Sequence, residues 1–179
     1  MSIEKLLERL PAYARDLKLN LPNLLQQPEL TPQQTWGTAL ACAMAARNGE
    51  LLAAIGEQAR QVLSETAFAA AQASSAIMGM NNVYYRFQHL CSNDRYKTIP
   101  ARLRMQVIRS HGSDPADFEL WCLAVSAING CGACVDSHER VVREKGLAEE
   151  SVAAAIRLSA VINALAGVLE AEEALRQPA

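Results

Sequence analysis

The chain has 179 residues and a mass near 19.4 kDa, which suits one domain or two small, closely packed halves. Half of its residues are hydrophobic, so a sizeable core can form, and the low-hydrophobicity composition of disordered proteins is excluded. Seventeen basic residues nearly balance 19 acidic ones, for a net charge of −2, and the lack of a basic surplus argues against nucleic-acid binding.

The N-terminal segment mixes acidic and apolar residues and lacks the uninterrupted apolar stretch of a signal peptide. The most apolar long stretch, residues 151–169, contains Arg157 and Asn163 among many alanines, which favours a buried helix over a membrane span. We therefore expect a soluble, cytoplasmic protein that does not contact membranes. In such a reducing compartment, five cysteines at irregular spacing do not indicate a disulfide framework.

Helical patterns extend along the whole chain, and convincing strand patterns are absent. Near the start, Leu6, Leu7 and Leu10 line one helical face. Further along, Thr31 and Pro32 form an N-cap followed by proline at the first helical position, with Gln34 at the capping-box position. Together these patterns predict an all-α protein of roughly eight to ten helices.

The same start signal recurs in the second half of the chain. Asp114 precedes a helix that we expect from about Pro115 to Ile128 and that would end at Asn129-Gly130. A following helix would begin near Cys131 and run to Lys145. Gly146 is its expected terminator, because glycine readily adopts the left-handed conformation that ends helices.

The sequence also contains an internal repeat. Residues 63–77 match residues 147–161 at seven of 15 positions, and an offset of 83 residues aligns Pro32 with Pro115. A polar segment at 91–100 would connect the repeated units. We expect a single domain made of two similar helical halves, about residues 1–90 and about residues 101–179.

Four residues around the expected turn carry the chemistry. Cys131, Cys134 and His138 fall on one face of their helix, at spacings of three and four residues. If the two helices fold back antiparallel, Glu119 lies about ten residues before the turn and His138 about eight after it, at similar heights for a rise of roughly 1.5 Å per residue. A carboxylate, an imidazole and two thiols can therefore converge.

These four side chains suit thiol redox chemistry. The thiolate is the reactive form of cysteine, a helix start stabilises it, and a histidine one turn away can accept the thiol proton. A carboxylate orients and polarises that histidine. The pattern predicts a dithiol that cycles between reduced and disulfide forms, without a metal or a tightly bound cofactor. The first half lacks this set, because its aligned positions hold Trp36, Asn48, Leu51 and Ile55.

A zinc site is an open alternative. Cys131, Cys134 and His138 would supply three ligands, with Glu119 or Cys122 as a fourth. Structural zinc sites usually bring two separated ligand pairs, which this sequence does not show. A second alternative is that the close cysteines are buried and purely structural.

The other cysteines and histidines have no comparable pattern. We expect Cys42, Cys91 and Cys122 to act as small apolar residues that fill the core. We expect His89 and His111 at the surface or in loops.

The residues of the candidate site resemble a known family. Glu119, the two close cysteines and the histidine follow the pattern E-x11-C-x2-C-x3-H within residues 118–139. Further stretches that resemble the family are residues 1–6, 18–21 and 77–86. Over essentially the whole chain, the sequence resembles the AhpD family of alkyl hydroperoxide reductases.

The resemblance implies an all-helical fold of the carboxymuconolactone-decarboxylase type, duplicated within the chain and assembled as a homotrimer. It also implies that the protein reduces the oxidised peroxiredoxin AhpC. Electrons would pass from NADH through dihydrolipoamide dehydrogenase and the lipoyl group of a 2-oxoacid dehydrogenase acyltransferase, with dihydrolipoamide as an external reductant. Weak direct reduction of alkyl hydroperoxides is implied as well. A non-redox, decarboxylase-like member of the superfamily is the alternative, although it would not need the cysteine pair.

By position, the resemblance makes Cys134 the thiol that becomes a sulfenic acid or a mixed disulfide, and Cys131 its partner and proton donor. His138 and Glu119 would form the proton relay. Some family members have a histidine where this chain has Ala133, so proton transfer here would rest on the relay alone. The helix start favours Cys131 as the more acidic thiol, whereas proximity to His138 favours Cys134, to which we assign the attack.

Overall fold

The computed structural model describes residues 2–176 of the chain, which form ten α-helices, one short 3₁₀ helix and no strand. The predicted all-α class and the predicted number of helices are confirmed. In chain order the helices are α1 (Ile3–Glu8), η1 (Ala12–Ala14), α2 (Arg15–Leu24), α3 (Pro32–Ala46), α4 (Gly49–Val62), α5 (Glu65–Leu90), α6 (Arg95–Thr98), α7 (Val107–Ser110), α8 (Pro115–Ile128), α9 (Gly132–Glu144) and α10 (Glu149–Arg176).

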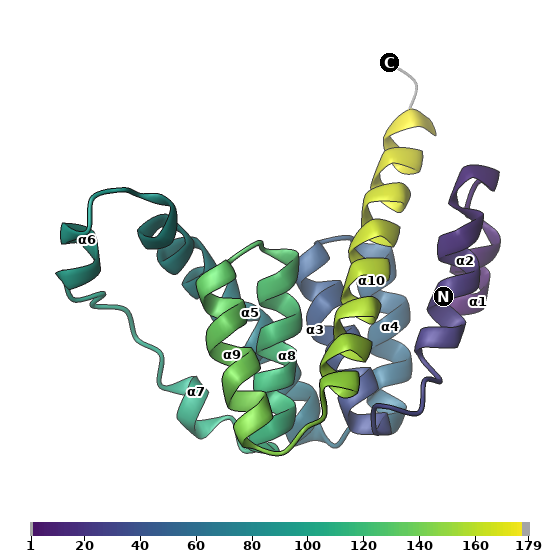
Figure 1. Cartoon of the computed structure of the whole chain (residues 1–179). Coiled ribbons are helices and arrows are strands. Elements are labelled where there is room, and N and C mark those ends of the chain that lie inside the picture. The colour runs from purple at the N-terminus through teal and green to yellow at the C-terminus, as the bar shows by residue number, and fades with distance from the viewer. Residues whose placement is uncertain (1, 177–179) are drawn as a thin grey trace.

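Helices α3, α4, α5, α8, α9 and α10 form a central bundle (Figure 1). Within it α8 contacts α3, α5, α9 and α10, so the helix that precedes the candidate site is held from several sides. On one side α1 packs on α4 and α2 packs on α10. On the opposite side residues 91–114, here called the arm, leave the bundle and carry α6 and α7 (Figure 1).

Capping side chains determine where the central helices begin. Thr31 Oγ1 accepts a hydrogen bond from the Gln34 backbone at 3.2 Å, and the Gln34 side chain accepts one from the Thr31 backbone at 3.0 Å. This is the predicted capping box. Asp114 caps α8 by accepting bonds from the Ala116 and Asp117 backbone, at 2.8 and 3.1 Å. The predicted bounds of α8 are therefore confirmed.

The helix starts repeat at the spacing seen in the sequence. The pairs of starting residues are Pro32 and Pro115 for α3 and α8, Gly49 and Gly132 for α4 and α9, and Glu65 and Glu149 for α5 and α10. The first two pairs are 83 residues apart and the third is 84 apart. This spacing supports the proposal of two similar helical halves.

Small residues allow the bundle helices to approach closely. A Cβ atom at Gly37 on α3 would overlap the indole ring of Trp121 on α8, so only glycine fits there. Trp121 is fully buried. The side of α8 that faces α3 is thereby fixed, and this helps to set the direction of Glu119 on the same helix.

Among the described residues, α10 alone is long and apolar enough to cross a membrane by length and composition. Half of its most apolar window is buried inside the bundle. Leu158, Ile162 and Leu165 are completely buried there. This agrees with the prediction that residues 151–169 form a buried helix.

Among the predicted surroundings of cysteine and histidine residues, that of Cys91 differs from the one observed, whereas His89 is exposed and His111 lies in a loop, as predicted. Cys42 and Cys122 are buried as expected, and burial raises the pKa of both thiols, which keeps them protonated. Cys91 is only partly buried, because it lies at the C-terminal end of α5 where the chain enters the arm. His111 is partly buried and stacks on Phe118, with ring centroids 4.0 Å apart, and burial lowers its pKa.

Candidate active site

The candidate site is built on the turn that joins α8 to α9. Gly130 has a φ of +67°, and its N–H donates to the carbonyl of Ala127 at 3.2 Å. The N–H of Cys131 donates to the carbonyl of Ser126 at 3.1 Å. These two bonds form a Schellman motif, in which glycine takes the left-handed position. Cys131 therefore completes the end of α8 and also serves as the N-cap of α9.

Cys131 and Cys134 are joined by a disulfide, with their Cα atoms 5.3 Å apart. The spacing of three residues in the first turn of α9 permits this bond, as the sequence predicted. Cys131 is completely buried, whereas Cys134 is 7% exposed and borders a cavity. A molecule that enters the cavity therefore meets the sulfur of Cys134 first.

His138 and Glu119 form a hydrogen-bonded pair beside the disulfide. His138 follows Cys134 by one turn on α9, Glu119 comes from α8, and His138 Nδ1 lies 2.6 Å from Glu119 Oε2. The side chains are only 13% and 15% exposed. A short bond to a carboxylate is strong and fixes both the orientation and the tautomer of the imidazole. The structure thus brings together all four residues that the sequence singled out.

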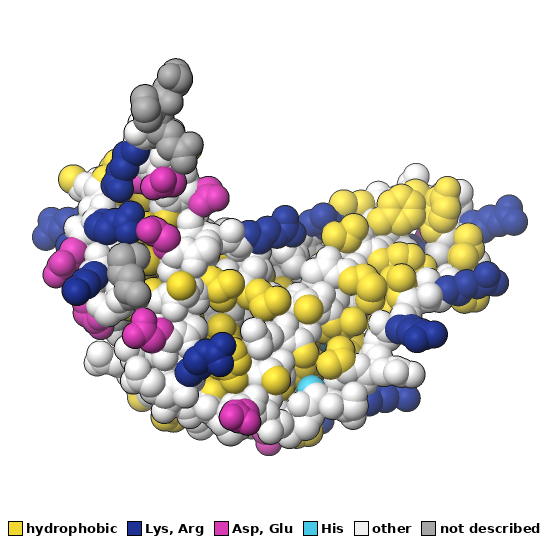
Figure 2. All heavy atoms as spheres, turned by 180° about the vertical axis from the view of Figure 1, so that it is seen from behind, with side chains coloured by type: hydrophobic (Ala, Val, Ile, Leu, Met, Phe, Trp, Pro, Cys, Tyr) yellow, Lys and Arg dark blue, Asp and Glu magenta, His cyan; other side chains and the backbone are white. Residues whose placement is uncertain are grey.

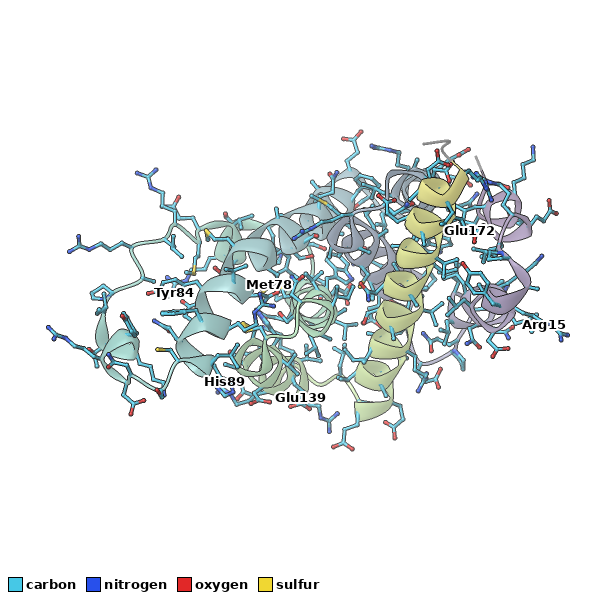
Figure 3. All side chains as sticks on the ribbon, turned by 90° about the horizontal axis from the view of Figure 1, so that it is seen from above. Arg15, Met78, Tyr84, His89, Glu139 and Glu172 are labelled. Atoms are coloured by element: carbon cyan, nitrogen blue, oxygen red, sulfur yellow. A yellow bond between two sulfur atoms is a disulfide. The ribbon has the colours of Figure 1, made fainter. Side chains whose placement is uncertain are left out.

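Met78 of α5 contacts the other nitrogen of this histidine. Its Sδ atom lies 3.2 Å from His138 Nε2. Figure 3 shows Met78 on α5, beside α8 and α9, which are seen end-on in this view. A thioether is a weak acceptor and no base, so Nε2 keeps its capacity to exchange a proton when Nδ1–H is held by Glu119. Met78 lies in the stretch 77–86 that resembles the family, and no sequence pattern predicted a role for it.

Asn82 connects α5 to the turn that presents Cys131. Its Nδ2 donates to Ser126 Oγ at 2.9 Å, and its Oδ1 accepts from Asn129 Nδ2 at 2.9 Å. Arg86, one turn later on α5, donates to the backbone carbonyl of Asn129. The side chain of Asn82 is completely buried. These contacts hold the end of α8, and with it the N-cap of α9, against α5.

A cavity of about 410 Å³ lies beside Cys134 and His138, within the size range of small-molecule sites. Helices α5, α8 and α9 and the arm all contribute to its walls. Its polar lining includes Glu119, Asn81 and Ser137. Its larger apolar lining residues are Met78, Tyr85, Met105, Ile108 and Val141.

Two ligands of the zinc alternative, Cys131 and Cys134, are bonded to each other in this structure. Within residues 2–176, no three His, Cys, Asp or Glu side chains are grouped as a metal-ligand set. Cys122, the alternative fourth ligand, is buried in the core, and burial raises the pKa of its thiol. The arrangement instead places a disulfide and an imidazole–carboxylate pair at one cavity.

Comparison with known proteins agrees with the fold and the site. Residues 95–177 match the carboxymuconolactone decarboxylase family. The chain is 59% identical over 172 residues to alkyl hydroperoxide reductase AhpD from Solibacter usitatus, and the aligned region covers 96% of this chain and 97% of that protein. It is 58% identical over 179 residues to AhpD from Acidobacterium capsulatum, and the aligned region covers 99% of this chain and 97% of that protein. A third relative, AhpD from Koribacter versatilis, is 56% identical over 174 residues, with 97% and 90% covered. The chain therefore belongs to the AhpD family of alkyl hydroperoxide reductases.

Proposed function

We propose that this protein is an antioxidant alkyl hydroperoxide reductase that works through a dithiol–disulfide cycle of Cys131 and Cys134. The observation that carries the proposal is the disulfide whose outer sulfur, on Cys134, borders the same cavity as the bonded pair of His138 and Glu119. The names of the relatives support peroxide as the oxidant.

In the main route the substrate is the disulfide of the peroxiredoxin AhpC. The Cys134 thiolate attacks one AhpC sulfur, a mixed disulfide forms, and the other AhpC sulfur leaves as a thiolate that takes up a proton. Cys131 then attacks the Cys134 sulfur, which releases the second AhpC thiol and closes the Cys131–Cys134 disulfide. AhpC gains two electrons and two protons, and this protein loses them.

A slower direct route uses an alkyl hydroperoxide. The Cys134 thiolate attacks the terminal oxygen, the O–O bond breaks, and the alkoxide leaves as an alcohol after taking a proton from Cys131. Cys134 is then a sulfenic acid. Attack by the Cys131 thiolate on that sulfur expels hydroxide, which becomes water, and forms the same disulfide.

His138 and Glu119 serve as the proton relay in both routes. With Nδ1–H donated to Glu119, Nε2 of the neutral imidazole accepts the thiol proton of Cys134, and the carboxylate stabilises the imidazolium that results. The neighbouring lining residue, Ala133, has no titratable group. Proton transfer therefore depends on His138 and Glu119.

We further propose that dihydrolipoamide reduces the disulfide. The lipoyl group would be carried by an acyltransferase and recharged from NADH by dihydrolipoamide dehydrogenase. Cys134 is recessed, at 7% exposure, and the cavity beside it has apolar walls. A slender lipoyl arm with its methylene chain suits a recessed site with apolar walls.

We propose a homotrimer as the working form, and the exposed apolar surface supports association with other copies of the chain. Val83, Phe87 and Leu90 of α5 are 60%, 50% and 75% exposed and lie on one helical face. Tyr96 and Ile99 add exposed apolar surface on the arm. Figure 2 shows hydrophobic side chains gathered over this part of the molecule. Burial of such a patch against other copies of the chain would remove it from water, and sedimentation analysis measures the number of copies.

Three unpaired cysteines, Cys42, Cys91 and Cys122, suit a reducing compartment, and we propose a cytoplasmic location.

Reconstitution tests the function as a whole. Dihydrolipoamide dehydrogenase, a lipoylated acyltransferase, this protein and AhpC are mixed with NADH and an alkyl hydroperoxide, and NADH oxidation is followed. We expect oxidation to require every component. Equal rates with Cys134→Ser would contradict the proposal and leave the non-redox, decarboxylase-like alternative.

A further inference from the structure

Asn81 is a buried amide in the active-site cavity, and its oxygen has no hydrogen-bond partner. The residue is 5% exposed, and its Oδ1 atom is inaccessible and unpaired. It lines the cavity together with Cys134 and His138. A buried polar group without a partner is penalised by its lost hydration, and few such groups remain in folded proteins. Because Asn81 lines the cavity, a small rotation of its amide would let a bound group supply the missing partner.

The adjacent residue shows what a structural asparagine on this helix looks like. Asn82 uses both ends of its amide, toward Ser126 and Asn129, at 2.9 Å each. Those bonds join α5 to the end of α8. Asn81 makes no such connection through its oxygen, although it is nearly as deeply buried. Its amide is not explained by the packing of the bundle.

The contacts of α5 place Asn81 close to the redox end of α9. Met78 meets His138, and further along α5 Asn82 meets Asn129, just before α9 begins. Since α5 and α9 therefore run antiparallel here, Asn81 lies at the level of the first turn of α9. Cys134 belongs to that turn.

The surroundings of Asn81 in the cavity are largely apolar. Val141 of α9 and, from the arm, Met105 and Ile108 provide hydrocarbon and thioether surface. The hydroxyl of Tyr85 is directed toward the Met105 sulfur, at 3.9 Å. Binding sites of this type use apolar walls for affinity and a few polar groups for orientation. A methylene chain bearing one amide matches such a lining.

We propose that Asn81 hydrogen-bonds the amide of the acyl arm that carries the reducing dithiol, and that it thereby favours an amide-linked dithiol over the free acid. A side-chain amide offers both a donor and an acceptor and is complementary to another amide. A carboxylate offers acceptors only and would bring a second negative charge into a cavity that already contains Glu119. This inference rests on the proposed function, because it concerns the reductant of the same disulfide.

Asn81 takes no part in the thiol–disulfide exchange itself. One thiolate of the dithiol attacks the Cys134 sulfur, and Cys131 leaves as a thiolate that takes up a proton. The second thiol of the reductant then displaces the Cys134 sulfur and closes the cyclic disulfide of the carrier. Two electrons and two protons pass to the protein. Asn81 acts only on the position of the arm.

The test measures second-order rate constants for reduction of the oxidised protein by dihydrolipoamide, dihydrolipoate and dithiothreitol at pH 7. In Asn81→Leu, which keeps a similar volume, we expect the preference for dihydrolipoamide over each of the other two reductants to fall about tenfold, the effect of one lost hydrogen bond. Asn20→Leu, at an exposed position on α2, is the matched control and should keep the wild-type preferences. Unchanged preferences in Asn81→Leu, or equal slowing with all three reductants, would overturn the inference.

Thermal unfolding separates positioning from a structural role. Asn81→Leu removes an unpaired polar group and should not lower the midpoint, whereas Asn82→Leu loses two bonds and should lower it. An equal loss in both variants would show that Asn81 is structural. If dihydrolipoamide fails to reduce the wild-type protein, the proposed reductant and this inference both fail. If it reduces the wild type and Asn81→Leu alike, only the inference fails.

Discussion

Helix pairs α3–α4 and α8–α9 begin at the same spacing, but only the second pair carries reactive side chains. Three pairs of positions 83 residues apart show the difference. The N-caps of α4 and α9 are Asn48 and Cys131. Within the helices, Leu51 corresponds to Cys134 and Ile55 corresponds to His138. Leu51 and Ile55 are completely buried and pack in the main core. One arrangement of helices thus supports a packed core in the first half and a reactive cavity in the second.

The N-cap of α9 lacks the side-chain hydrogen bond that the N-cap of α4 makes. Asn48 caps α4 in the usual way, because its Oδ1 accepts a bond from the Leu51 N–H at 2.9 Å. Cys131 caps α9 without a side-chain hydrogen bond. The uncapped N–H groups and the helix dipole can then stabilise a thiolate on Cys131. A stabilised Cys131 thiolate is a good leaving group when the cavity-lining Cys134 sulfur is attacked, so the positions of the two cysteines are complementary.

The largest difference between the halves should appear at Cys134 and its counterpart Leu51. Cys134→Ser should abolish AhpC-dependent turnover, because no disulfide can form, with little change in stability. Leu51→Ala should retain turnover per folded molecule but lose about 2–5 kcal/mol of unfolding free energy, as expected for a buried leucine. Steady-state assays and urea unfolding measure the two effects. Turnover in Cys134→Ser would contradict the claim that the reactive thiol lies at this position of the second half.

The roles of the two cysteines can be separated by trapping. Cys131→Ser should hold AhpC as a mixed disulfide on Cys134, because no second thiol remains to release it. Cys134→Ser should not trap AhpC. Non-reducing electrophoresis with mass spectrometry identifies the adduct. Trapping through Cys131 alone would reverse the assignment and make the helix start the deciding factor.

A smaller difference is expected at His138 and Ile55. General-base assistance is worth about 10²–10⁴-fold in rate, so His138→Phe should slow turnover at pH 7 by a factor in that range. Part of the loss should be recovered at higher pH, where the thiolate forms without help. Ile55→Val should leave turnover intact and cost about 0.5–1.5 kcal/mol of stability. Near-normal turnover of His138→Phe would remove the relay from the mechanism.

The smallest expected difference concerns the two N-caps. Asn48→Ala removes the cap of α4 and a bond to Glu170, and should cost about 0.5–2 kcal/mol. In the reduced protein, Cys131→Ser supplies α9 with a capping hydroxyl and should be neutral or stabilising by about 1 kcal/mol, although it ends the cycle. Chemical denaturation in the presence of a reductant gives both values. Clear destabilisation by Cys131→Ser would show that Cys131 is retained for packing.

The sequence predicted those features that depend on local rules. The ends of α8 followed from Asp114, Pro115 and Gly130, because capping and left-handed glycine are properties of a few adjacent residues. The approach of Glu119 to His138 followed from helical rise and a single turn between two helices. Each needed only short-range geometry.

The features that the sequence analysis missed depend on tertiary packing. Met78 and Asn81 reach the site from α5, and no periodicity relates that helix to α9. The connection expected at 91–100 extends to residue 114 as the arm, whose Met105 and Ile108 form cavity walls. Only the family stretch at 77–86 marked α5 as unusual, and it gave no physical role to its members.

Reduction of the Cys131–Cys134 disulfide by different thiols is the most direct test of the central claim. The oxidised protein is treated with dihydrolipoamide, reduced thioredoxin or glutathione, and the thiols are alkylated and mapped by mass spectrometry. We predict that dihydrolipoamide reduces the disulfide fastest and converts two cysteines per chain, Cys131 and Cys134, while Cys42, Cys91 and Cys122 remain thiols throughout. Faster reduction by thioredoxin or glutathione, or a bridge that involves Cys122, would contradict the account.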